Sequence, residues 1–283
     1  MASPRKLNCP LPDALWAALE ARTRNTGETL DQAVVRCLGE ALDLSRHSIF
    51  QISTSAALVK GVYQGAATVA EVKRHGDFGL GTFENLDGEG MQLDGNCFQA
   101  KGDGSVTQPS DATPVPFWVT TRFKADRTET LSEVRSWADL CDRLTKLRTS
   151  DNLVAAIRLD GVLDFVHVRT ACKSAPGTDL VTAASRQKEF KFEKVQGTLL
   201  GFFTPTYART INVPGYHLHL LTEDRKHGGH VLEVRAARLQ ALLHLTSDLH
   251  LVLPENEEFL KANLTQDPAA ALAKAEGGAA TNS

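Results

Sequence analysis

The segment of residues 215–230 constrains the fold and the chemistry of this chain more than any other. It carries His217 and His219 two residues apart, and His230 follows after a turn-forming stretch, Asp224–Gly229. In an extended strand, side chains two residues apart lie on the same face. The stretch predicts a hairpin connection, so a returning strand that begins near His230 brings a third imidazole to that face. Three neutral imidazoles with one open coordination position are typical of catalytic zinc.

A second ligand set competes with this one. Glu223 lies four residues after His219 and keeps the same strand parity. His217, His219 and Glu223 therefore resemble the first metal motif of cupins, which favours iron or manganese. We expect His227, in the turn beside two glycines, to be exposed. Structural roles are expected for the remaining candidates, which follow or occupy apolar runs: His167, His244 and His250.

The composition is that of an ordinary globular protein and argues against a nucleic-acid-binding or membrane-spanning protein. The chain has 283 residues, of which 42% are hydrophobic and 23% charged, enough for one large or two medium cores. A net charge of -3 supplies no basic field for nucleic acid or an anionic membrane. No apolar run predicts a membrane span or a signal segment. The five cysteines lack C-x-x-C spacing, which indicates free thiols in a reducing compartment and a cytoplasmic enzyme.

Residues 1–47 predict a separate helical extension. The first helix has apolar residues at helical spacing and ends at Gly27, which favours a left-handed stop. Thr29 and Gln32 form a capping box at the start of a second helix, whose apolar face runs from Leu30 to Leu42. With the extended stretch Lys6–Leu11, the pair resembles a ribbon-helix-helix module. Few basic side chains project from that stretch, so we expect dimerisation or docking rather than DNA binding.

From residue 48 onward, short β-type runs are separated by glycine-containing turns. The predicted strands are 78–83, 90–93, 96–100, 116–123, 153–169, 196–204, 216–222 and 230–234, with an extended stretch at 249–254. The predicted helices are 54–63, 68–75, 131–148 and 235–245. Because strands and helices do not alternate regularly, we predict a mixed-sheet α/β fold of the α+β kind. A main domain is expected over residues 48–265, followed by an alanine- and glycine-rich tail, 266–283.

Two charged residues at strand ends are further candidates for a site. Glu89 follows the turn Leu86-Asp87-Gly88 at the start of a strand, where a carboxylate can lie beside an active site. Arg169 ends an apolar strand, and its planar guanidinium suits a carboxylate ligand. On composition and spacing alone, a solvated surface residue is the favoured interpretation at both positions, because charged residues at strand ends are usually solvated.

Taken together, these segments resemble the acetolactate decarboxylase family. The motifs that carry the resemblance are Gly81-Thr82-Phe83, Leu86-Asp87-Gly88-Glu89, Val168-Arg169-Thr170, Gly201-Phe202, His217-x-His219 and His230. They occur in the family's order between about residues 50 and 260, so the N-terminal helices lie outside the resemblance. The resemblance implies a mixed α/β fold, a homodimer, and zinc held by His217, His219 and His230. It thereby removes Glu223 from the expected ligand set.

The resemblance also implies a reaction, the conversion of 2-acetolactate into acetoin and carbon dioxide. Loss of carbon dioxide from a β-keto acid leaves electrons that the ketone must receive, so zinc at the C3 oxygen would stabilise an enediolate. By resemblance, Arg169 positions the substrate carboxylate, Glu89 helps to deliver a proton to one face, and Thr82 supplies a supporting hydrogen bond. A further family glutamate comes from a C-terminal tail that folds over the site, and its best match is Glu276.

Overall fold

The chain divides into two compact units, residues 1–46 and 47–283, and the computed structural model describes residues 8–41 and 47–276. The smaller unit contains α1 (Asp13–Thr26) and α2 (Leu30–Ala41). As predicted, Gly27 ends α1 in the left-handed region, at a φ of 72°. Thr29 and Gln32 exchange the hydrogen bonds of a capping box, at 2.9 and 3.3 Å. Residues 8–11 of the predicted extended stretch form no strand, while Lys6, Leu7 and Leu42 lie outside the described residues.

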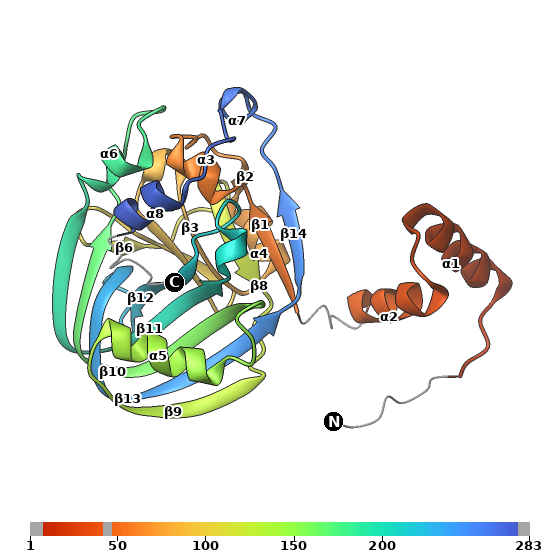
Figure 1. Cartoon of the computed structure of the whole chain (residues 1–283), viewed down its shortest axis with the longest axis horizontal. Coiled ribbons are helices and arrows are strands. Elements are labelled where there is room, and N and C mark those ends of the chain that lie inside the picture. The colour runs from red at the N-terminus through yellow and green to blue at the C-terminus, as the bar shows by residue number, and fades with distance from the viewer. Residues whose placement is uncertain (1–7, 42–46, 277–283) are drawn as a thin grey trace. The chain divides into compact units, whose positions relative to one another are not determined.

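The larger unit is built on two main β-sheets that pack against each other (Figure 1). The first sheet has the order β14 (Asp248–Val252), β1 (Ser48–Ile52), β8 (Phe117–Thr121), β3 (Phe78–Thr82), β4 (Glu89–Leu93), β5 (Asn96–Ala100) and β6 (Val106–Thr107). The second has the order β10 (Val154–Thr170), β11 (Lys188–Thr204), β12 (Gly215–Thr222), β13 (Gly228–Thr246) and β9 (Arg127–Val134). Because β10 also pairs with β13, the second sheet closes on itself. A small ribbon joins β2 (Ala67–Thr68) to β7 (Pro114–Val115).

Short helices cover the edges of these sheets. They are α3 (Ser55–Val59), α4 (Val69–His75), α5 (Trp137–Leu147), α6 (Leu180–Ala184), α7 (Glu257–Lys261) and α8 (Ala269–Ala275), with 3₁₀ turns at Glu84–Leu86 and Thr206–Ala208. The helices α3, α6 and α8 contact one another at one end of the unit (Figure 1), and α5 packs on β9 and β13. Within the described residues, no helix has the length and apolar character that crossing a membrane requires. The mixed arrangement of strands and helices confirms the predicted fold class.

Three apolar clusters are found among the described residues, and the two largest lie inside and between the two main sheets. The first core lies where β3 and β4 face β11 and β12, and it includes Leu80, Met91 and Phe202. The second core gathers the inward side chains of the closed sheet, such as Leu159 and Leu239, and α5 closes it with Leu140. Strands alternate between two faces, so the long strands β10, β11 and β13 can pack on both sides. β12, which carries two of the histidines, packs on both faces, with Leu221 in the first core and Leu220 in the second.

Three helix predictions are wrong in part or in whole, and the first of them, 54–63, is a helix only over Ser55–Val59. Residues 235–245 form no helix but belong to β13. Alanine, leucine, arginine and glutamine favour helices locally, yet β10 and β9 pair with this segment from both sides and override the propensity. The predicted helix 131–148 is a helix only over Trp137–Leu147, because residues 131–134 complete β9.

A pair of variants on β10 tests the core of the closed sheet. Leu159 is fully buried, whereas Val162 is 47% exposed. We expect Leu159→Ala to lower the free energy of unfolding by about 2 to 5 kcal/mol, because the lost methyl groups leave a cavity. Val162→Ala should change it by no more than about 0.5 kcal/mol. Urea denaturation followed by circular dichroism measures both values, and equal losses would contradict a core inside this sheet.

Candidate metal centre

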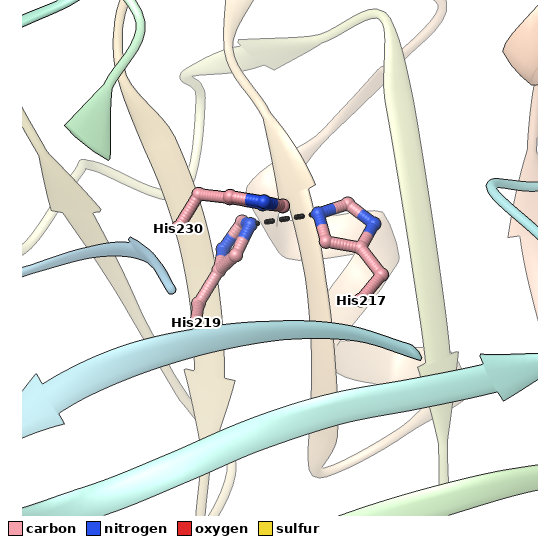
Figure 2. A group of neighbouring side chains, drawn as sticks. All are labelled: His217, His219 and His230. Carbon is pink, nitrogen blue, oxygen red and sulfur yellow. Dashed lines mark hydrogen bonds between the residues drawn. The ribbon is translucent and has the colours of Figure 1, made fainter. Parts of the chain in front are cut away.

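Strand pairing brings the three predicted histidines together. His217 and His219 lie on the same face of β12, and His219 is directly opposite His230 of β13. His230 is in turn opposite Arg169 of β10, so these side chains form a row across three strands. Gly229 permits this approach: its φ is +142°, and a Cβ there would lie 2.6 Å from the carbonyl oxygen of Arg169. Figure 2 shows the three imidazoles pointing toward a common point, as the spacing predicted.

The imidazole nitrogens are arranged to converge on one ion. One nitrogen of each ring lies within 4.8 Å of the others, and the Nε2 atoms of His217 and His219 are 3.0 Å apart. A zinc ion with Zn–N bonds of about 2.0 Å holds two nitrogens about 3.3 Å apart in tetrahedral geometry. The ring planes are inclined to one another by 52° to 70°, so their lone pairs do not lie in parallel planes. The centre therefore fits a single small cation.

The protonation states also suit metal binding. Burial lowers the pKa of His217 and of His219 to about 3, with the charge of Arg169 acting in the same direction. Burial and Arg169 likewise hold the pKa of His230 well below its ordinary value. His219 Nδ1 lies 3.0 Å from the carbonyl oxygen of Gly90, which can only accept, so Nδ1 carries the proton and Nε2 presents its lone pair. The neutral imidazole is the form that binds a metal ion.

A second cluster of ligand-type side chains lacks this convergence. His47, Asp126 and His244 also place one nitrogen or oxygen each within 4.8 Å. The rings of His47 and His244, however, stack with an interplanar angle of only 14° and centroids 5.4 Å apart. Lone pairs in two nearly parallel planes do not meet at one ion. The cluster has the geometry of a stacked pair, in keeping with the structural role expected for His244.

The remaining predicted site residues line one pocket beside the imidazoles. Thr82, Glu89, Arg169 and Glu276 share with His217 and His230 a pocket of about 60 Å³. One water needs about 10 to 15 Å³ on this scale, so the pocket has room for several waters or one small organic molecule. Much of the remaining lining is apolar and comes from Leu58, Leu86, Phe117, Leu180, Val213 and Leu272. The pocket therefore suits a small ligand with one charged and one apolar end.

The C-terminal tail supplies one carboxylate to this pocket. The tail forms α8, whose Leu272 and Ala275 are buried in the core between the sheets. Glu276 follows directly, and its Oε2 accepts a hydrogen bond from Arg169 Nη2 at 2.9 Å and lies 3.5 Å from His230 Nε2. Arg169 also donates to the carbonyl oxygen of Ala275. Packing of α8 thus places Glu276 where the tail of the sequence was expected to fold.

Glu89 faces the histidines from the opposite sheet. It opens β4 directly opposite Thr82 of β3, and Thr82 Oγ1 donates to the Gly88 carbonyl at 2.8 Å. The Oε1 atom of Glu89 accepts from the Ala171 amide at 3.0 Å, and Oε2 lies 3.7 Å from His219 Nε2. Burial, together with the charge of Glu276, raises the pKa of Glu89 to about 7 despite the opposing charge of Arg169. This carboxyl can therefore carry a proton near neutral pH.

Other sequence expectations fall outside the pocket. Glu223 and His227 are exposed in the turn between β12 and β13, so Glu223 does not join His217 and His219 as a cupin-like ligand. Nothing in the sequence indicated that the Gly90 carbonyl accepts from His219. Every residue carries a carbonyl, and this one meets His219 only because the two sheets face each other. Sequence reasoning also missed the apolar wall of the pocket, whose residues come from elements far apart in the chain.

Comparisons with known proteins agree with this geometry. The sequence model described as Alpha-acetolactate decarboxylase matches residues 49–266, so α1 and α2 lie outside it. An alpha-acetolactate decarboxylase of Methanosarcina mazei is 42% identical over 229 residues, which is 81% of this chain and 80% of the relative. The corresponding protein of Bacillus subtilis is 36% identical, over 76% of this chain and 85% of the relative.

Solved structures resemble this chain as well. The crystal structure of alpha-acetolactate decarboxylase from Bacillus subtilis strain 168 superposes with a TM-score of 0.79 at 35% identity, over 82% of this chain and all of the other (100%). A Staphylococcus aureus protein described as similar to alpha-acetolactate decarboxylase gives a TM-score of 0.77 at 29% identity, over 81% and 99% of the two chains. The chain therefore belongs to the alpha-acetolactate decarboxylase family and is an enzyme of the carboxy-lyase class.

Proposed function

We propose that this enzyme converts 2-acetolactate into acetoin and carbon dioxide, with zinc held by His217, His219 and His230. The observation that carries the proposal is the convergence of three neutral imidazoles beside a buried arginine and a buried carboxyl in one pocket. Its relatives bear the name of this activity. Three nitrogen ligands in tetrahedral geometry with an open position suit zinc among the divalent ions.

The substrate's charged and apolar parts match the two sides of the pocket. Arg169 keeps its Nε atom buried without a hydrogen-bond partner within residues 8–41 and 47–276. This free donor, beside the pair with Glu276, positions the carboxylate that is lost as carbon dioxide. The two methyl groups of acetolactate then face the apolar wall. Zinc bound by the histidines would supply a Lewis acid for the C3 ketone, the electron acceptor of the decarboxylation.

Proton delivery is assigned to Glu89. Its Oε1 is fixed by the Ala171 amide, so the carboxyl approaches the pocket from one side only. A proton carried on this group reaches the enediolate carbon on a single face, which yields one enantiomer of acetoin. Thr82 supports this position through its hydrogen bond to the Gly88 carbonyl, just before Glu89.

Loss of a histidine ligand tests the metal centre. We expect purified protein to release acetoin from racemic 2-acetolactate, to lose this activity in a chelator, and to regain it with zinc. His219→Ala should lower kcat/KM by at least about 1000-fold, because the centre loses a ligand. His227→Ala is the matched control, since this histidine is exposed in the neighbouring turn. No acetoin from folded, zinc-loaded protein would overturn the proposed reaction.

The pH dependence of turnover tests the role of Glu89. Because the acid form donates the proton and its pKa is raised to about 7, kcat should fall as the pH rises through this value. A bound cation adds positive charge nearby, which lowers the pKa of Glu89 and moves the fall in kcat to lower pH. Glu89→Gln should lower kcat by about 100- to 10,000-fold and remove this fall of kcat with pH. Glu84→Gln, outside the pocket, is the control. If the kcat of Glu89→Gln still falls over the same pH range, the titrating group is not Glu89.

The contribution of the tail is tested by Glu276→Gln and by truncation after Asp267. Both changes remove the carboxylate that pairs with Arg169, so we expect turnover to fall about tenfold or more while zinc stays bound. Lys274→Ala is the control, because this side chain is exposed on the same helix. Metal content and kcat are measured on the same samples. An unchanged rate in Glu276→Gln would remove Glu276 from the mechanism.

A further inference from the structure

A buried tryptophan lies behind the carbonyl group that orients His219. His219 belongs to the closed sheet, but the acceptor for its Nδ1 proton is the Gly90 carbonyl of the facing sheet, at 3.0 Å. Gly90 lies in β4 between Gly81 of β3 and Gln99 of β5. The orientation of the His219 imidazole therefore depends on where β4 holds this one carbonyl group.

The position of Gly90 is in turn limited by Trp118. A Cβ at Gly90 would lie 2.4 and 2.6 Å from two carbons of the Trp118 ring. A Cβ at Gly81 would lie 2.5 and 2.7 Å from two other carbons of the same ring. The indole therefore covers both glycines on the outer face of the sheet. Glu89 and Met91 alternate with Gly90 and face the opposite side, toward the metal centre and the inner core.

The indole itself has little freedom to move. Trp118 is fully buried, and its Nε1 donates to Gln92 Oε1 at 3.4 Å. Gln92 is held by its own bond to the Gly76 carbonyl, at 2.8 Å, and by Thr120 Oγ1, at 2.6 Å. Phe83 packs edge-on against the ring with centroids 5.6 Å apart. A rigid surface thus supports β4 at Gly90.

We propose that Trp118 is a positioning residue of the metal centre, acting through the Gly90 carbonyl on His219. This inference rests on the metal site proposed above. The carbonyl keeps the proton on Nδ1 and the ring aimed at the ion, and the indole keeps the carbonyl in place. Outer partners of metal-binding histidines change metal affinity by about 10- to 100-fold when they are altered. Trp118 belongs to this class although it touches neither metal ligand nor substrate.

The test compares Trp118→Phe with Val72→Ala, a substitution on α4 in the same apolar cluster. Zinc dissociation constants of the full chain are measured by competition with a chromophoric chelator. We expect Trp118→Phe to weaken zinc binding about 10- to 100-fold and Val72→Ala to weaken it less than about threefold. In the metal-free protein, ¹⁵N spectra of the imidazoles should show the His219 Nδ1 proton in the wild type and in Val72→Ala, and its loss or shift in Trp118→Phe.

A second pair of variants keeps the inference falsifiable if Trp118→Phe loosens the whole core. Gly90→Ala should weaken zinc binding strongly beside Trp118 and less in a Trp118→Leu background, where the two ring contacts at 2.4 and 2.6 Å are gone and the Gly81 carbonyl oxygen, at 2.9 Å, is the remaining close atom. Additive effects of the two substitutions would overturn the inference, as would wild-type affinity in Trp118→Phe or an equal loss of affinity in Val72→Ala. A wild-type chain that binds no zinc would overturn the proposed function itself, and this inference with it.

Discussion

The pairing of β13 with both β10 and β12 is the interaction on which the rest of the site depends. It closes the second sheet and sets His219, His230 and Arg169 in one row across three strands. Ladder hydrogen bonds fix this row more rigidly than a loop would, because each strand is held by a neighbour on either side. Gly229 makes the close approach of β13 to the Arg169 backbone possible.

The facing sheet completes the centre and gives it its electrostatic character. β4 brings the carboxyl of Glu89 and the carbonyl of Gly90 to the histidines, and α8 brings Glu276 to Arg169. Three imidazoles remain neutral because burial disfavours their charged form. The carboxylate of Glu276 compensates the charge of Arg169. A buried guanidinium without such a partner would be strongly destabilising. The pocket therefore combines neutral imidazoles with a paired arginine and a carboxyl that can carry a proton near neutral pH.

The sequence could predict those parts of the site that depend on local periodicity. The spacing of His217 and His219, the turn, and His230 specified one face of a hairpin, and Glu89 does begin a strand after its turn. Gly27 and the Thr29 capping box are local signals as well, and both appear in the structure. The assignment of Glu276 came from the family resemblance, and the packing of α8 places this residue at Arg169.

Features that depend on contacts between distant strands could not be predicted in this way. Residues 235–245 have helical composition, and only their pairing with β9 and β10 makes them a strand. The same holds for closure of the second sheet, for the Gly90 carbonyl and for the indole behind it. The homodimer implied by the resemblance and the cytoplasmic location inferred from the cysteines stay predictions. The account of the site itself is tested most directly by titrating metal-free protein with zinc while bound metal and acetoin release are measured on the same sample. We expect activity to rise linearly and to level off at one zinc per chain, with His219→Ala showing neither binding nor activity; acetoin release that is independent of zinc, or that persists in His219→Ala, would contradict it.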